Sequence, residues 1–263
     1  MENPRRYGEA PFRIAVVHGG PGAGGELAPV ARELARRRGV LEPIQTATTL
    51  EGQVIELRHA IERHAEVPAT LVGYSWGAWL ACLVASAHPP IVARLVLVSS
   101  GPFEPGYFGR LQETRMARLS PGERAEFEEV VRRLNAPICE TRDEALARLG
   151  ALCSKTDDFD PLPWGTRADE AVPCDGAMFH GVWTAAAEMR RTGELMGRVR
   201  RIRCPVVAIH GAYDPHPAEG VEKPLSAALR EFRFVLLDRC GHTPWLERHA
   251  RGAFYEALEG ALA

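Results

Sequence analysis

The sequence predicts an α/β protein: a mostly parallel sheet with helices on both faces and a helical insertion in the chain. Short apolar runs alternate with amphipathic helical patterns over the first part of the chain, and the same rhythm returns after residue 198. Between these parts, residues 103–198 hold helical or irregular patterns and no convincing strand. Since alternating strands and helices build a parallel sheet covered on both faces, the middle segment is expected to be inserted into one sheet domain.

The first part of the chain supplies the first strands and helices of the expected sheet. We expect strands at residues 12–17, 40–44, 70–73 and 92–99, and helices at residues 26–38, 51–66 and 76–87. The apolar run at residues 92–99 has the pattern of a parallel strand buried on both faces. Pro43 weakens the strand around it, and Pro89 and Pro90 stop the third helix.

The rhythm breaks at Gly101-Pro102 and resumes near the end of the chain. In the insertion, helical spacing predicts helices at residues 123–134, 143–152 and 179–196, with a proline-rich and acidic loop at residues 155–175. After it we expect strands at residues 205–210 and 232–237, and helices at residues 218–231 and 245–262. The domain boundaries predicted from this pattern are residues 1–102 together with 199–263 for the sheet domain, and residues 103–198 for the insertion.

Composition excludes several classes of function. The net charge of −2 offers no basis for binding nucleic acid or an anionic membrane surface. No signal peptide and no run of about 18 apolar residues is visible, so we expect neither export nor a membrane span. The six cysteines, which show no metal-binding spacing, are interpreted as reduced thiols of a cytoplasmic protein.

Ser75 lies in the pattern Gly73-Tyr74-Ser75-Trp76-Gly77, between an expected strand and an expected helix. A Gly-x-Ser-x-Gly in that setting is the sequence form of a nucleophile elbow, a sharp turn that lifts the serine hydroxyl above the sheet. The glycines two positions either side remove side chains that would clash at the turn. Ser75 is therefore the candidate nucleophile.

A serine nucleophile needs a base, and the base needs an acid that orients it. In chain order the acid should come next and the histidine last, each after its own strand. Asp214 follows the expected strand at residues 205–210, and His242 follows the strand at residues 232–237. The alternatives are a turn-forming aspartate before Pro215 and a solvent-exposed loop histidine.

The glycine-rich loop at residues 18–22, His-Gly-Gly-Pro-Gly, is the candidate source of an oxyanion-hole amide. The negative charge of a tetrahedral intermediate needs backbone donors, and one should be the amide of Trp76, directly after the nucleophile. We assign the second donor to Gly20, because Pro21 has no N–H. Phosphate binding is the alternative for such a loop, but the Lys-Ser/Thr ending of a P-loop is missing.

Together, the loop at residues 18–22, the elbow at residues 73–77, Asp214 and His242 resemble the α/β-hydrolase family. Within it, the glycine-rich loop and the Ser-Trp-Gly elbow resemble the proline iminopeptidase branch. The resemblance implies the α/β-hydrolase fold, with residues 103–198 as a mainly helical cap. It also implies an acyl-Ser75 intermediate, with His242 as general base and then acid and Asp214 as its orienting acid. It implies no metal and no organic cofactor.

Two features of the chain differ from that branch. Only eleven residues precede the strand at residue 12, so the usual N-terminal hairpin is expected to be absent and the sheet to have about six strands. The branch holds the free amino group of its substrates with cap glutamates near a Trp-Glu pair. This chain offers Trp183 and Glu188 but no such pair.

These inferences predict a serine hydrolase of the esterase kind that cleaves a small ester, amide or thioester. The alternatives are a carbon–carbon bond hydrolase with the same triad, an aminopeptidase of the proline iminopeptidase type, and a non-catalytic binding member of the fold. The candidate substrate-binding residues are Phe179, His180, Trp183 and His216. A small-molecule substrate is the expected partner, while the choice between monomer and homodimer stays open.

Overall fold

The structure is a computed structural model that describes residues 2–136, 140–163, 172 and 175–263. A seven-stranded sheet runs through it in the order β1-β3-β2-β4-β5-β6-β7, and all neighbours are parallel except β1 and β3. The strands are β1 Arg5–Tyr7, β2 Phe12–Val17, β3 Gly39–Glu42, β4 Ala69–Tyr74, β5 Val92–Val98, β6 Val206–Gly211 and β7 Phe232–Leu237. The predicted α/β architecture is confirmed.

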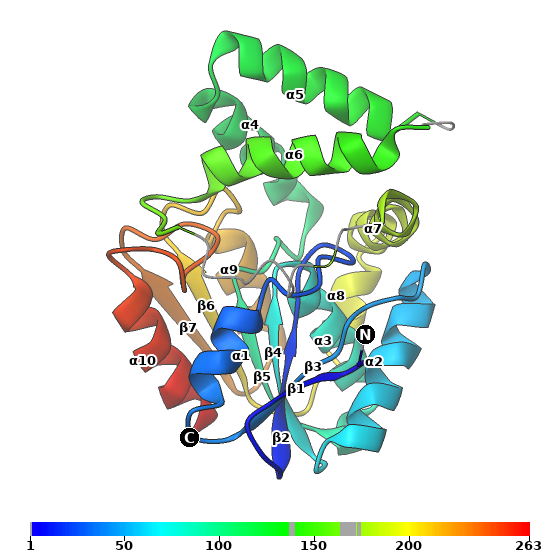
Figure 1. The fold of residues 1–263 in the computed structure, drawn as a ribbon, viewed down its shortest axis with the longest axis vertical. Coiled ribbons are helices and arrows are strands. Elements are labelled where there is room, and N and C mark those ends of the chain that lie inside the picture. Colours follow the sequence, from blue (N-terminus) through cyan, green and yellow to red (C-terminus); the bar gives the residue numbers. More distant parts are fainter. Residues whose placement is uncertain (1, 137–139, 164–171, 173–174) are drawn as a thin grey trace.

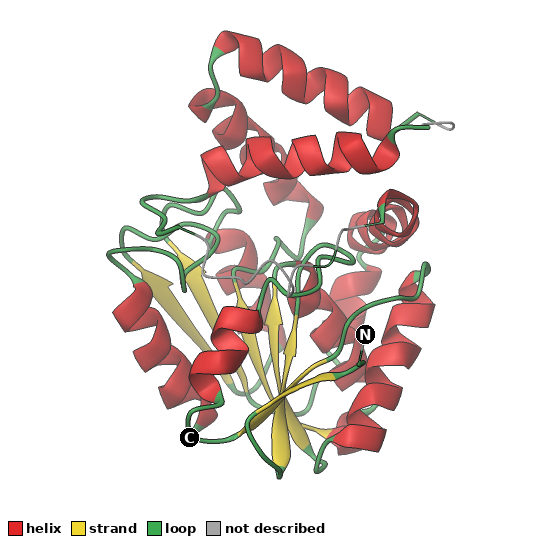
Figure 2. Ribbon diagram, in the orientation of Figure 1, coloured by secondary structure: helices red, strands yellow, loops and turns green. Residues whose placement is uncertain are grey.

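Helices cover both faces of the sheet (Figures 1 and 2). One face packs against α1 (Ala28–Leu34) and α10 (Arg251–Leu262). The other face packs against α2 (Leu50–His64), α3 (Trp76–Ala87), α8 (Glu194–Val199) and α9 (Glu219–Ala228). The inner strands are apolar almost throughout because each of them contributes side chains to both cores.

The sheet has one strand more than the expected six or so. β1 pairs antiparallel with β3, with Arg6 opposite Leu41. The Tyr7 hydroxyl donates a 2.8 Å hydrogen bond to the buried carboxylate of Glu42, which also lies 3.6 Å from Arg5. A strand of three residues is too short for alternation to show, so only its tertiary partners mark it.

Between β5 and β6 the described residues contain helices and no strand of the sheet. These helices are α4 Phe108–Arg118, α5 Pro121–Leu134, α6 Arg142–Asp157, α7 Gly176–Arg191 and α8. In Figure 1, α4, α5 and α6 lie beyond the ends of the strands at which β4, β6 and β7 finish. A capping box starts α5, since Ser120 and Glu123 each bond the other's backbone N–H.

Three predicted boundaries in this part and near the C-terminus were wrong. The single helix expected at residues 179–196 is two helices, because Gly193 adopts a left-handed conformation with φ 80°. The helix α6 continues to Asp157, beyond the expected start of the loop at residue 155. The last helix begins at Arg251 rather than residue 245, since the buried Glu247 side chain bonds neighbouring loops.

Two further expectations concern the whole chain. The four described cysteines, Cys82, Cys153, Cys204 and Cys240, are free thiols, while Cys139 and Cys174 lie outside the described residues. Within the described ranges, every helix is too short or too polar to cross a lipid bilayer.

Candidate active site

Ser75 occupies a strained turn between β4 and α3. Its φ of 52° and ψ of −116° are unusual for a residue with a side chain. A Cβ on Gly73 would lie 2.4 Å from the carbonyl oxygen of Gly77, and one on Gly77 would lie 2.1 Å from that of Val17. Both glycines are therefore required by the close approach of backbones, as the elbow pattern predicts.

The structure brings Ser75, His242 and Asp214 together. The Nε2 atom of His242 lies 3.2 Å from the Ser75 hydroxyl oxygen, and its Nδ1 atom lies 2.7 Å from Oδ2 of Asp214. Asp214 stands on the loop after β6, and His242 on the loop after β7. Because parallel strands end at the same edge of the sheet, residues far apart in sequence meet there.

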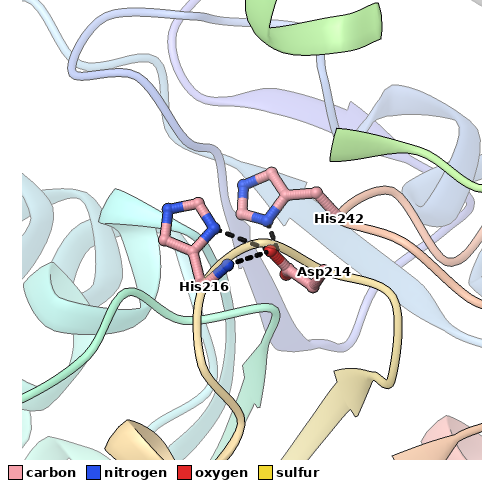
Figure 3. A group of neighbouring side chains, drawn as sticks. All are labelled: Asp214, His216 and His242. Carbon is pink, nitrogen blue, oxygen red and sulfur yellow. Dashed lines mark hydrogen bonds and ion pairs between the residues drawn. The ribbon is translucent and has the colours of Figure 1, made fainter. Parts of the chain in front are cut away.

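His216 completes the surroundings of Asp214 (Figure 3). Its Nδ1 and its backbone N–H both donate to Oδ1 of Asp214, at 2.7 and 2.9 Å. The His216 ring stacks on the His242 ring, with centroids 4.5 Å apart and planes 22° from parallel. The sequence made His216 a candidate substrate-binding residue; in the structure it is a buried loop residue that holds the Asp214 carboxylate.

Burial and neighbouring charges set the protonation of this network. Burial alone would raise the pKa of Asp214, but His242, His216 and His210 around it hold that pKa well below its usual range. Burial also opposes the charged form of His242, yet Asp214 outweighs it and raises the pKa of that imidazole. Burial lowers the pKa of His216 to about 4 in spite of Asp214. At neutral pH, His216 is therefore a neutral donor to an ionised Asp214.

The His242 loop is held from several sides. Its backbone N–H donates to the carbonyl of Asp157 at 2.8 Å. The Glu247 carboxylate, which is fully buried, accepts hydrogen bonds from the amides of Gly241 and Phe159, both at 2.7 Å. These bonds restrict the position of the imidazole, which must stay within reach of both Ser75 and Asp214.

The glycine-rich loop is fastened by Gln45. The Gln45 side-chain amide donates to the His18 carbonyl at 2.9 Å, and its oxygen accepts from the Gly22 amide at 3.1 Å. Gly20 has φ 104°, a conformation that favours glycine. In the described part of the chain, no acceptor takes a hydrogen bond from the amide of Gly20 or of Trp76. Both N–H groups are thus available to a ligand.

A stack of aromatic rings connects α3 with α7. Trp79 stacks on Trp183 with centroids 5.9 Å apart, and Trp183 stacks on Phe179 at 6.0 Å. Trp79 also meets the ring of Trp76, the residue after Ser75, at 6.4 Å. The half-buried His180, on the same helix, hydrogen-bonds to none of the described residues. Two of the candidate substrate-binding residues, Phe179 and Trp183, are thus brought together.

Glu26 was missed at the level of sequence. Its Oε2 atom is buried and accepts no hydrogen bond from the described residues, and a Cβ on Gly19 would lie 2.7 Å from it. Burial raises the pKa of this carboxyl to about 7. Its position four residues after the glycine-rich loop was the available signal, but nothing local in the sequence indicates burial.

Metal binding can be considered for one group among the described residues, Asp214, His216 and His242, whose ligand atoms lie within 4.8 Å of one another. The Nδ1 atoms of both imidazoles already hydrogen-bond to the two carboxylate oxygens. Hydrogen bonding therefore accounts for the clustering of these three side chains without a cation.

Comparison with known proteins gives a family and a fold. A model of the alpha/beta hydrolase family matches residues 14–257. No curated protein is similar enough in sequence to match the chain.

Solved structures resemble the chain over nearly all of its length. VinJ is 18% identical with a TM-score of 0.72, and the alignment covers 98% of this chain and 93% of VinJ. Est816, described as an N-acyl homoserine lactone degrading enzyme, is 19% identical with a TM-score of 0.63, covering 97% and 95%. Proline iminopeptidase from Mycobacterium smegmatis is 17% identical with a TM-score of 0.60, covering 97% and 92%. At these identities the likeness concerns the fold alone, and the proline iminopeptidase branch stays a prediction.

Proposed function

Because the chain belongs to the alpha/beta hydrolase family, we propose that it is a serine hydrolase acting on a small ester, amide or thioester. The observation that carries the proposal is the pair of contacts made by His242, 3.2 Å to the Ser75 hydroxyl oxygen and 2.7 Å to Asp214. A base in reach of both a nucleophile and an orienting acid is the arrangement that activates a serine. Ser75, His242 and Asp214 are thus the proposed catalytic residues.

In the proposed reaction, His242 accepts the Ser75 proton as the hydroxyl oxygen attacks the acyl carbon. The bond to the leaving group breaks, and His242 delivers the proton to that group. Water then attacks the acyl-Ser75 ester with His242 again as base, which releases the acid and restores the hydroxyl. Asp214, ionised because its pKa is held low, keeps His242 in the required tautomer and stabilises its charged form.

The amides of Gly20 and Trp76 are the proposed oxyanion donors. Both lack an acceptor in the described part of the chain, and Trp76 opens α3, where the first N–H groups have no partner within the helix. The field of the helix N-terminus adds to the stabilisation of negative charge there.

Substrate selection is assigned to the insertion. We treat residues 103–198 as the cap and residues 1–102 with 199–263 as the core, with Phe179, His180 and Trp183 in the substrate-binding part. The position of Trp183 on Trp79, which itself meets Trp76, supports an apolar wall that starts beside the nucleophile. The His-Gly-Gly-Pro-Gly loop keeps an aminopeptidase of the proline iminopeptidase type as the second candidate.

A fluorophosphonate probe tests the serine hydrolase. We expect the probe to label the wild-type protein on Ser75 and Ser75→Ala to abolish both labelling and ester hydrolysis, with a nearly unchanged melting temperature. Ser86→Ala is the matched control, since Ser86 is a buried serine on the same helix α3 whose hydroxyl donates to the Leu83 carbonyl. Turnover that survives Ser75→Ala would rule out the proposed nucleophile.

A substrate panel separates the candidates. Esters and thioesters of small acids should be cleaved by the esterase-like enzyme. Preferential cleavage of anilides of proline with a free amine would instead favour the aminopeptidase.

A further inference from the structure

Arg190 is a buried cation near the C-terminal end of α7. Only 6% of the residue is exposed. The guanidinium carbon lies 4.3 Å from the centre of the Phe108 ring and 5.5 Å from that of the Trp79 ring. Phe108 opens α4 and Trp79 belongs to α3, so the charge stands where three helices meet.

Among the described residues, no carboxylate pairs with this charge. The Nε atom is buried without a hydrogen-bond partner, and the two terminal nitrogens also bond to nothing in the described chain but keep some contact with solvent. No carboxylate of the described residues lies within ion-pair distance of Arg190. Burial is the one influence on its pKa, which it lowers.

Burying an unpaired guanidinium lowers the stability of the folded protein, and folding by itself gives no reason for it. A guanidinium carries five N–H donors, and a buried charge without a partner loses its hydration. Contacts between the guanidinium and the faces of aromatic rings offset part of that loss. They do not supply oxygen acceptors for the N–H groups, which point outward in the plane of the guanidinium. The edge of the guanidinium that retains solvent contact is therefore free to bind a ligand.

The location of Arg190 connects it with Ser75. Trp79 follows Ser75 by four residues, about 6 Å along the axis of α3. The Trp79 indole N–H donates to the carbonyl of Gly101 at 3.1 Å, and Gly101 lies just beyond the end of β5. The Trp79 ring beside the guanidinium is thus fastened at the end of the sheet that carries the nucleophile, where ligands of parallel α/β sheets gather.

We propose that Arg190 binds a carboxylate of the substrate, so that the enzyme acts on esters, amides or thioesters that carry a second, ionised acid group. The proposal rests on the proposed function and adds a substrate class to it. A carboxylate matches the planar guanidinium with two parallel hydrogen bonds and supplies the missing counter-charge. Trp79 and Trp183 would pack against the carbon chain between the two acid groups.

Paired substrates test the proposal. One pair is the para-nitrophenyl ester of glutarate, with a free carboxylate, and that of its monomethyl ester. The other pair is the acetate of para-hydroxybenzoate and the acetate of its methyl ester, which moves the carboxylate to the leaving group. We expect wild-type kcat/KM to favour the charged member of at least one pair. A preference in the first pair would place the carboxylate bound by Arg190 on the acyl group, and a preference in the second pair would place it on the leaving group.

Variants of Arg190 test whether this residue causes the preference for charged substrates. Arg190→Met keeps the aliphatic stem and should reduce the charged-to-neutral ratio on the order of 10- to 100-fold, the effect of losing a hydrogen-bonded ion pair. Arg190→Lys should retain part of it, as a single charge without the fork. Arg191→Met is the matched control, because Arg191 is the next residue of α7 but is exposed and paired with Glu188. An unchanged ratio in Arg190→Met, or no preference in the wild type, overturns the proposal.

Binding separates this proposal from the proposed function. Calorimetry with glutarate on Ser75→Ala, which needs no turnover, should detect binding that is lost in the double variant with Arg190→Met. Neutral esters that are hydrolysed without any response to carboxylates would leave the hydrolase standing and refute the role of Arg190. Glutarate binding without hydrolysis of any ester would do the reverse.

Discussion

Arg115 and Arg190 both lie on the inserted helices, Arg115 half-buried and Arg190 buried, but their surroundings differ in one respect. Arg115, on α4, forms two hydrogen bonds with the carboxylate of Asp157, at 2.9 and 2.5 Å. Arg190, on α7, lies beside the rings of Trp79 and Phe108 and forms no ion pair with a described residue. The attraction between Arg115 and Asp157 offsets the cost of removing both charges from water, whereas no described carboxylate offsets that cost for Arg190.

The two arginines differ in charge compensation, and they also lie in different places. Asp157 bonds the backbone of His242 through its carbonyl, so the Arg115 pair fixes the loop that carries the proposed base. Together with Glu247, whose carboxylate accepts from the amides of Gly241 and Phe159, the pair holds the His242 loop in place. The face of α7 carries an unsatisfied charge instead, which is the form expected of a surface completed by a ligand.

The largest expected effect comes from breaking the network at its centre. His242→Ala should lower kcat/KM by on the order of 10⁴- to 10⁶-fold, because Ser75 then has no base. Steady-state kinetics on a neutral ester would measure this. His216→Ala should cost at most about tenfold, since it removes only one bond to Asp214. If His216→Ala lowered kcat/KM more than His242→Ala, His216 and not His242 would be the base.

Asp214→Asn should change both rate and pH dependence. A protonated His242 cannot accept the Ser75 proton, so activity is present above the pKa of His242 and is lost as the pH falls through it. Asp214 raises that pKa, so the wild-type midpoint should lie above the ordinary histidine value of 6.5. In Asp214→Asn the midpoint should move down and the rate should fall by about 10⁴-fold. A kcat/KM profile gives both quantities; an unmoved midpoint contradicts the assignment.

Arg115→Met tests the compensated arginine. It leaves the Asp157 carboxylate buried without its cation, which should lower the free energy of unfolding by about 3–5 kcal/mol. Denaturant titration would measure the change. The matched control is Arg148→Met, whose pair with Glu126 is exposed and should contribute nothing measurable. Equal effects of the two variants would show that burial does not govern the Arg115 pair.

Arg190→Met should have the smallest effect on stability and the opposite sign to Arg115→Met. Removing an uncompensated charge relieves its burial, while the lost aromatic contacts oppose that gain. The free energy of unfolding should stay unchanged or rise by about 1 kcal/mol. The same denaturant titration applies. A loss as large as that of Arg115→Met would show that the packing of the Arg190 side chain outweighs the cost of burying its charge.

The positions of the longer strands along the chain and the elbow could be predicted because their signals are local. Buried parallel strands require apolar runs, and the turn at Ser75 requires Gly73 and Gly77, whose Cβ atoms would collide with backbone. The insertion was less predictable. Gly193 ends one helix and starts another only because its backbone takes a left-handed conformation, which no periodicity shows.

The sequence by itself determined the α/β architecture, the position of Ser75 and the candidates Asp214 and His242, because apolar runs, chain order and residue type suffice for these. The tertiary structure alone decided that His216 shares Asp214, that Arg115 pairs with Asp157 and that Arg190 pairs with none of the described carboxylates. These facts depend on side chains from elements far apart in the chain. Burial and charge compensation are properties of such neighbours, and no stretch of sequence contains them.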